Sequence, residues 1–121
     1  MGTTDHTSMA LSDRARAYLK GLARERETTT YRHLAQALDL RPPNTIHQVT
    51  KVLEDLMRED HESGVPVLAA LVASKVRNGL PAPGFFRLAC ELGRYDGPES
   101  GPAAEAYHAA ELERAWKHWS G

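Results

Sequence analysis

The apolar residues of the first part of the chain recur every three or four positions, which is the spacing of an amphipathic helix. One such stripe covers residues 11–26, and a second covers residues 31–38. Between them stand three threonines, residues 28–30, whose β-branched side chains favour a very short strand. The hydroxyl of Thr30 is also suited to capping the helix that follows. The pattern therefore predicts a helix, a short strand and a second helix.

A third apolar stripe, over residues 44–63, is the most regular in the chain. It places these residues on one side of a predicted helix: Ile46, Val49, Val52, Leu53, Leu56 and Met57. Asn44 is suited to capping the start of this helix, and Gly64 to ending it, because glycine accepts the left-handed backbone that follows many helices. Residues 39–43 include two consecutive prolines, which cannot continue a helix. We therefore expect two helices joined by a turn.

The pattern changes after Pro66. Residues 67–76 are apolar on both alternating sets, which is typical of a buried strand, although the alanines among them leave a helix open. Asn78 and Gly79 predict a turn, which the following prolines and Gly84 extend into an exposed loop. Residues 85–92 return to a short helical run. Alternatively, residues 85–88 form the second strand of a wing.

The two ends of the chain differ in character. Residues 1–10 are polar and small, and we expect them to form a flexible tail. Residues 94–102 are rich in glycine, proline and acidic residues, which indicates a linker between a domain at residues 11–93 and a last helix at residues 103–121. Trp116 and Trp119 lie on one side of that helix, which is expected to dock on the domain. Alternatively, this helix docks on a partner protein or on a second copy of the chain, since large aromatic side chains anchor such interfaces.

The order of these elements predicts a mainly α (α+β) fold. Two helices joined by a turn and followed by a strand and a glycine-containing loop outline a winged-helix-like helix-turn-helix domain. The small β element and the additional C-terminal helix complete the predicted architecture.

Two segments resemble known bacterial proteins. Residues 29–38, TTYRHLAQAL, resemble the opening of the helix-turn-helix part of alkylguanine-DNA alkyltransferases and their catalytically inactive relatives. The Pro-Cys-His-Arg motif of the active enzymes is absent, so alkyl transfer is not implied. Residues 68–86, LAALVASKVRNGLPAPGFF, resemble a segment that small bacterial winged-helix-like proteins of uncharacterised activity combine with the same opening. The resemblance implies the fold rather than an activity.

Composition narrows the class of protein. Hydrophobic residues make up 41% of the 121 residues, as in globular proteins, and the single cysteine allows no internal disulfide. The sequence begins without a recognisable signal peptide and lacks an apolar run of membrane-spanning length, which predicts a cytoplasmic protein that does not enter the membrane.

The net charge is −1, yet residues 13–26 hold five basic and two acidic side chains. Residues 75–94 hold four basic and one acidic, so a local basic surface is expected.

Polar side chains on the third predicted helix suit the reading of DNA. In helix-turn-helix proteins the start of the second helix of the motif enters the major groove, where Asn and Gln bind adenine and Lys reaches guanine. Basic residues of the preceding helix and of the predicted wing would hold phosphates. The predicted nucleic-acid-binding set is Arg32, His33, Arg41, Asn44, Thr45, His47, Gln48, Lys51, Lys75, Arg77 and Asn78. We therefore expect a small DNA-binding regulator.

A protein-interaction module, such as an antitoxin, immunity protein or adaptor, is the alternative. Residues 54–62 contain five acidic residues and one arginine, and residues 96–121 contain five acidic and two basic residues. These acidic segments, with Asp55 and Glu59 on one helical face, would meet a basic partner.

No pattern of residues indicates catalysis or a cofactor. The six histidines lack the i, i+4 pairing of a zinc helix, and residues 79–84 lack the lysine and hydroxyl of a nucleotide-binding loop. Cys90 lies in a partly apolar run and is expected to be packed rather than reactive. We therefore expect a non-enzymatic protein without a metal or other cofactor.

Overall fold

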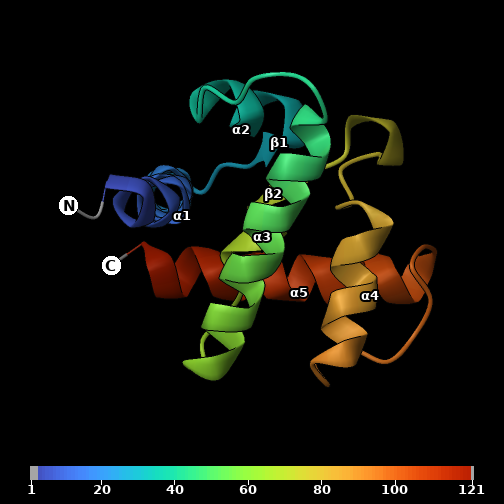
Figure 1. Ribbon diagram of the computed structural model, residues 1–121. Coiled ribbons are helices and arrows are strands. Elements are labelled where there is room, and N and C mark those ends of the chain that lie inside the picture. The colour runs from blue at the N-terminus through green and yellow to red at the C-terminus, as the bar shows by residue number, and fades with distance from the viewer. Residues whose placement is uncertain (1–2, 121) are drawn as a thin grey trace.

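The computed structural model describes residues 3–120, with side chains from residue 11 onward (Figure 1). Its elements are α1 (Thr3–Arg24), β1 (Thr29–Thr30), α2 (Tyr31–Ala37), α3 (Thr45–Glu62), the 3₁₀ turn η1 (Leu68–Leu71), β2 (Val72–Ala73), the 3₁₀ turn η2 (Lys75–Arg77), α4 (Pro83–Glu91) and α5 (Pro102–Trp119). The predicted mainly α class with a small β element is confirmed. No helix within residues 3–120 carries an apolar stretch long enough to cross a bilayer.

Helix α1 begins at Thr3, so residues 3–10, which the sequence analysis assigned to a tail, belong to this helix. Residues 1 and 2 of that tail lie outside the described part of the chain. Ala15, Leu19 and Ala23 are fully buried and face the core. This spacing of four residues explains why α1 packs along one stripe only.

Helices α2 and α3 agree with the predicted pair to within two residues at each end. The hydroxyl oxygen of Thr30 accepts a hydrogen bond from the backbone N–H of His33 at 3.1 Å, as expected of a cap. Asn44 precedes α3 in the left-handed conformation, at φ 60°, and its side chain forms no capping hydrogen bond. Its predicted role as a side-chain cap is therefore wrong. Asn44 instead supplies a backbone conformation that asparagine tolerates better than most residues.

The buried segment after α3 is not the long strand that was predicted. Only Val72 and Ala73 form a strand, which pairs in parallel with Thr29 and Thr30, while residues 68–71 form a 3₁₀ turn. The ladder is two residues long because β1 ends where α2 begins, at Tyr31. The remaining backbone N–H groups of this buried segment need other acceptors.

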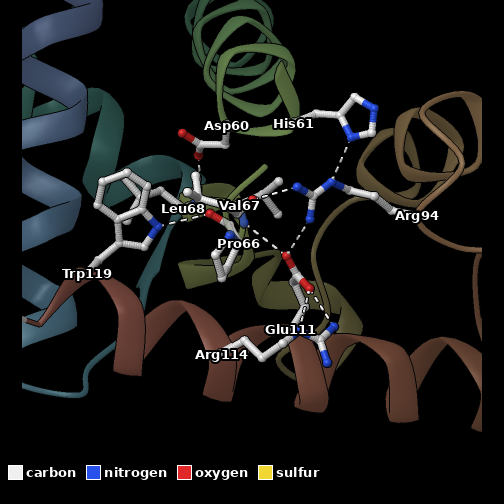
Figure 2. A network of polar contacts seen from close by, with 10 residues as sticks. Asp60, His61, Pro66, Val67, Leu68, Arg94, Glu111, Arg114 and Trp119 are labelled. Carbon is white, nitrogen blue, oxygen red and sulfur yellow. Dashed lines mark hydrogen bonds and ion pairs between the residues drawn. The ribbon is translucent and has the colours of Figure 1, made fainter. Parts of the chain in front are cut away.

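Two buried carboxylates supply those acceptors (Figure 2). Asp60 of α3 accepts the N–H of Leu68 at 3.0 Å, and Glu111 of α5 accepts the N–H of Val67 at 2.9 Å. Arg94 donates to Glu111 at 3.1 Å and also to the carbonyl oxygen of Val65. Burial raises the pKa of Asp60, against the lowering effect of its hydrogen bonds. The buried segment is thus held by side chains from two helices.

The remaining helices, α4 and α5, complete the packing of the core. Residues 85–88 lie in α4, so the alternative of a second wing strand is wrong. Phe85, Phe86, Leu88 and Ala89 of this helix are buried, which explains its helical rather than alternating pattern. Helix α5 packs on the rest of its own chain: the indole of Trp119 donates to the carbonyl oxygen of Pro66 at 2.9 Å.

Candidate nucleic-acid interface

Three segments that are far apart in the sequence meet at one hollow of the surface. The starts of α2 and α3 and the η2 turn enclose a volume of about 430 Å³, which we call the α2–α3 hollow. In Figure 1 α2 and the start of α3 lie at the end of the molecule away from α5. The hollow is lined by Thr30, Tyr31, Arg32, His33, Ile46, Thr50, Ser74, Lys75, Val76 and Ala82.

The charged side chains of the α2–α3 hollow are all basic. Arg32 and Lys75 line it together with His33, and no acidic residue does. Both cations are exposed, and neither has an ion-pair or hydrogen-bond partner among the residues that the structure describes. Three members of the predicted set therefore come together although 43 positions separate Arg32 from Lys75. Their side chains are free to meet an anionic ligand.

The first two turns of α3 continue this surface. Asn44, His47 and Lys51 are exposed, and Thr45 is half-buried. The ammonium of Lys51 lies 3.6 Å from the carboxylate of Asp55, one turn further along the helix. An exposed pair of this kind contributes little, so the lysine can exchange it for a contact with a ligand.

Three other members of the predicted set, Gln48, Arg77 and Asn78, have roles within the protein. The amide of Gln48 donates to the carbonyl oxygens of Arg41 and Pro43, each at 2.9 Å, and so closes the turn before α3. Arg41 pairs with Asp39 at 3.3 Å, and because both side chains are largely exposed, this pair, like that of Lys51, leaves the guanidinium available to a ligand.

At the end of η2, the guanidinium of Arg77 donates to the carbonyl oxygen of Glu99 and lies 6.0 Å from the Phe86 ring. Asn78 adopts the left-handed conformation, at φ 54°, that the turn after η2 requires. These are intramolecular roles that the sequence pattern does not distinguish from ligand binding.

Two exposed apolar side chains border the α2–α3 hollow, and neither was expected to be exposed. Ile46 was assigned to the buried stripe of its helix, but 51% of its surface is exposed because it lies one turn before the packed part of α3. Val76 is 89% exposed on η2. Its position between Lys75 and Arg77, in a segment expected to be buried, was the available signal.

An apolar groove adjoins the α2–α3 hollow between α3 and α4. It encloses about 240 Å³ and shares Tyr31, Thr50 and Ala82 with the hollow. The phenol oxygen of Tyr31 accepts the N–H of Ala82 at 2.9 Å, which joins α2 to the start of α4. Burial raises the pKa of Tyr31. Tyr31 thus lines both cavities and fixes the position of α2 relative to the start of α4.

Most acidic residues of α3 are engaged within the molecule. Arg16 of α1 binds Glu59 at 2.9 Å and Asp60 at 2.7 Å, and Asp55 faces Lys51. The acidic face proposed for a basic partner is therefore partly neutralised by the chain's own arginine and lysine.

Residues suited to catalysis or metal binding do not converge. Within residues 11–120, whose side chains the structure describes, no group of three His, Cys, Asp or Glu side chains is arranged to hold a metal ion. Cys90 is exposed rather than packed, because it lies on the outer side of α4, and its sulfur is 3.7 Å from the carbonyl oxygen of Gly97.

Comparison of the chain with protein-family models, with curated proteins and with solved structures gave no match.

Proposed function

We propose that this protein is a small DNA-binding regulator of the helix-turn-helix, winged-helix-like type, acting in the bacterial cytoplasm. The observation that carries the proposal is the pair of unpaired cations, Arg32 and Lys75, in a hollow whose lining residues include no acidic side chain. In a chain of net charge −1, such a surface concentrates positive potential where α2, α3 and η2 converge.

In this proposal the start of α3 enters the major groove. Asn44, His47 and Lys51 then face base edges, while Arg32 and Lys75 bind phosphates on either side. Gln48 acts indirectly, because its two hydrogen bonds fix the turn that orients α3. The η2 turn takes the place of a wing, since it follows the strand and projects beside the same helix.

The geometry favours DNA over a basic protein partner. Within residues 54–62, Asp60 is buried at 2% exposure and Glu59 pairs with Arg16, so a protein partner bound there would compete with Arg16 for Glu59. The cations of the α2–α3 hollow, by contrast, are already exposed and unpaired.

The test is an anisotropy titration of a labelled, mixed-sequence DNA duplex at several salt concentrations between about 50 and about 200 mM. Affinity should fall steeply with salt, since each phosphate neutralised by the protein releases counterions. In the variant Arg32→Gln/Lys75→Gln, the slope of log affinity against log salt should decrease in magnitude by about two.

A matched control removes two cations elsewhere. Arg24 and Lys117 are also exposed and unpaired within the described residues, but they lie on α1 and α5. Arg24→Gln/Lys117→Gln changes the net charge by the same amount and should leave the salt slope near that of the wild type. Equal losses in both variants, or no binding at low salt, would refute the proposed interface.

A further inference from the structure

Ile46 and Val76 are the two exposed large apolar side chains beside the cations of the α2–α3 hollow. Isolated apolar residues on a surface need no explanation, but these two come from different elements and line one hollow. Tyr18, the remaining exposed large apolar residue among those described, lies on α1 and does not line it. A ligand that is complementary to the hollow in charge and polarity therefore carries apolar groups between anionic groups.

The major groove of DNA presents this combination. Phosphates border the groove, and within it the 5-methyl group of thymine is the apolar group that side chains contact. Arg32 and Lys75 match the first feature, and Ile46 and Val76 match the second. Ile46 is on the first turn of α3, next to the exposed His47, so it lies on the part of the helix that the proposed function places in the groove.

We infer that Ile46 and Val76 are specificity-determining residues that contact the 5-methyl groups of pyrimidines in the major groove. This inference rests on the proposed DNA-binding function and adds the chemical class of the preferred sites, which are those rich in thymine. The two side chains would gain contact area on binding without any polar group being left unpaired, because a methyl group needs no hydrogen-bond partner.

The experiment adds or removes the methyl group alone. An alternating A·T duplex is compared with the same duplex carrying uracil in place of thymine. An alternating G·C duplex is compared with its 5-methylcytosine form, whose methyl group occupies the same position in the groove. For the wild-type protein, each methyl group contacted should change affinity about fourfold, the effect of burying one such group. Uracil should weaken binding, and 5-methylcytosine should strengthen it.

The variant Ile46→Ala/Val76→Ala separates contact from DNA shape. Both side chains are exposed, so the variant should fold, and circular dichroism checks this. It should bind all four duplexes without discriminating by the methyl group, whereas Tyr18→Ala should discriminate as the wild type does. A methyl effect that persists in the double variant would come from DNA shape and would overturn the inference. Equal wild-type affinities within each pair would also overturn it while leaving DNA binding intact, and no binding at low salt would refute both proposals.

Discussion

The carboxylates of Asp60 and Glu111 lie on different helices and accept hydrogen bonds from consecutive backbone N–H groups, those of Leu68 and Val67. Both side chains are almost fully buried, at 2% and 1% exposure. Together they replace the strand partner that the two-residue ladder does not provide. The position of β2, and through it of η2 with Lys75, depends on this pair.

Glu111→Ala should destabilise the protein by about 3–5 kcal/mol, because it leaves Arg94 without its buried partner and the N–H of Val67 without an acceptor. Urea unfolding followed by circular dichroism measures the loss. Glu113→Ala on the same helix removes an exposed ion pair with Arg26 and should cost at most about 1 kcal/mol. Similar losses in the two variants would contradict the role of the buried network.

Gln48→Ala should cost about 1–3 kcal/mol, since each of its two hydrogen bonds to the turn contributes about 0.5–1.5 kcal/mol. Gln48→Glu should cost more, because a carboxylate would face two carbonyl oxygens. His47→Ala, at the neighbouring exposed position, should change the free energy of unfolding by no more than about 0.5 kcal/mol. If Gln48→Ala is as mild as His47→Ala, Gln48 does not hold the turn.

His108 should make stability depend on pH. Burial lowers its pKa, although Nε2 donates a hydrogen bond to the carbonyl oxygen of Ala70 at 2.9 Å. The neutral form is therefore favoured in the folded protein. The contribution of His108 to the free energy of unfolding is complete above the pKa of its imidazole in the unfolded chain, about 6.5. This contribution is lost as the pH falls through the lowered pKa of the folded state.

The measurement for His108 is the free energy of unfolding of the wild type and of His108→Gln, from pH 7.5 downward. The stability advantage of the wild type should shrink below about pH 6.5. His118→Gln, which replaces an exposed histidine of α5, controls for the loss of an imidazole. A difference that stays constant with pH would show that His108 is not responsible.

Tyr107→Phe should be neutral or stabilise the protein by up to about 1 kcal/mol, because the buried hydroxyl has no hydrogen-bond partner among the described residues. Burial, with a further contribution from Glu111, raises the pKa of Tyr107 to about 12. An ultraviolet absorbance titration should show a tyrosine ionisation step near this pH, and its amplitude should decrease by one tyrosine in Tyr107→Phe. A native spectrum in which all four tyrosines of the chain ionise together would contradict this environment.

The sequence was sufficient for α2 and α3, because apolar spacing, the Thr30 cap and Gly64 are local signals. It was insufficient for residues 67–76. Those residues have the composition of a strand, but their hydrogen-bond acceptors come from Asp60 and Glu111, whose proximity only the tertiary structure creates.

The residues of the candidate site, too, could be predicted from the sequence only in part. Arg32, His33 and Lys75 were expected to bind the ligand, and they do share one surface. Arg77 was grouped with them because it is basic and near Lys75. Its carbonyl partner, however, belongs to Glu99 in the segment before α5, which no local pattern reveals.

The attachment of α5 has a practical consequence for studying the protein in solution. Both tryptophans of the chain lie on this helix, and their indole N–H groups bind carbonyl oxygens of Glu27 and Pro66. Cationic side chains of α1 lie over the Trp119 ring, with Lys20 at 5.2 Å. Intrinsic emission therefore reports the detachment of one helix without any added label. Its comparison with the circular dichroism of the whole backbone shows whether α5 separates before the rest of the molecule unfolds.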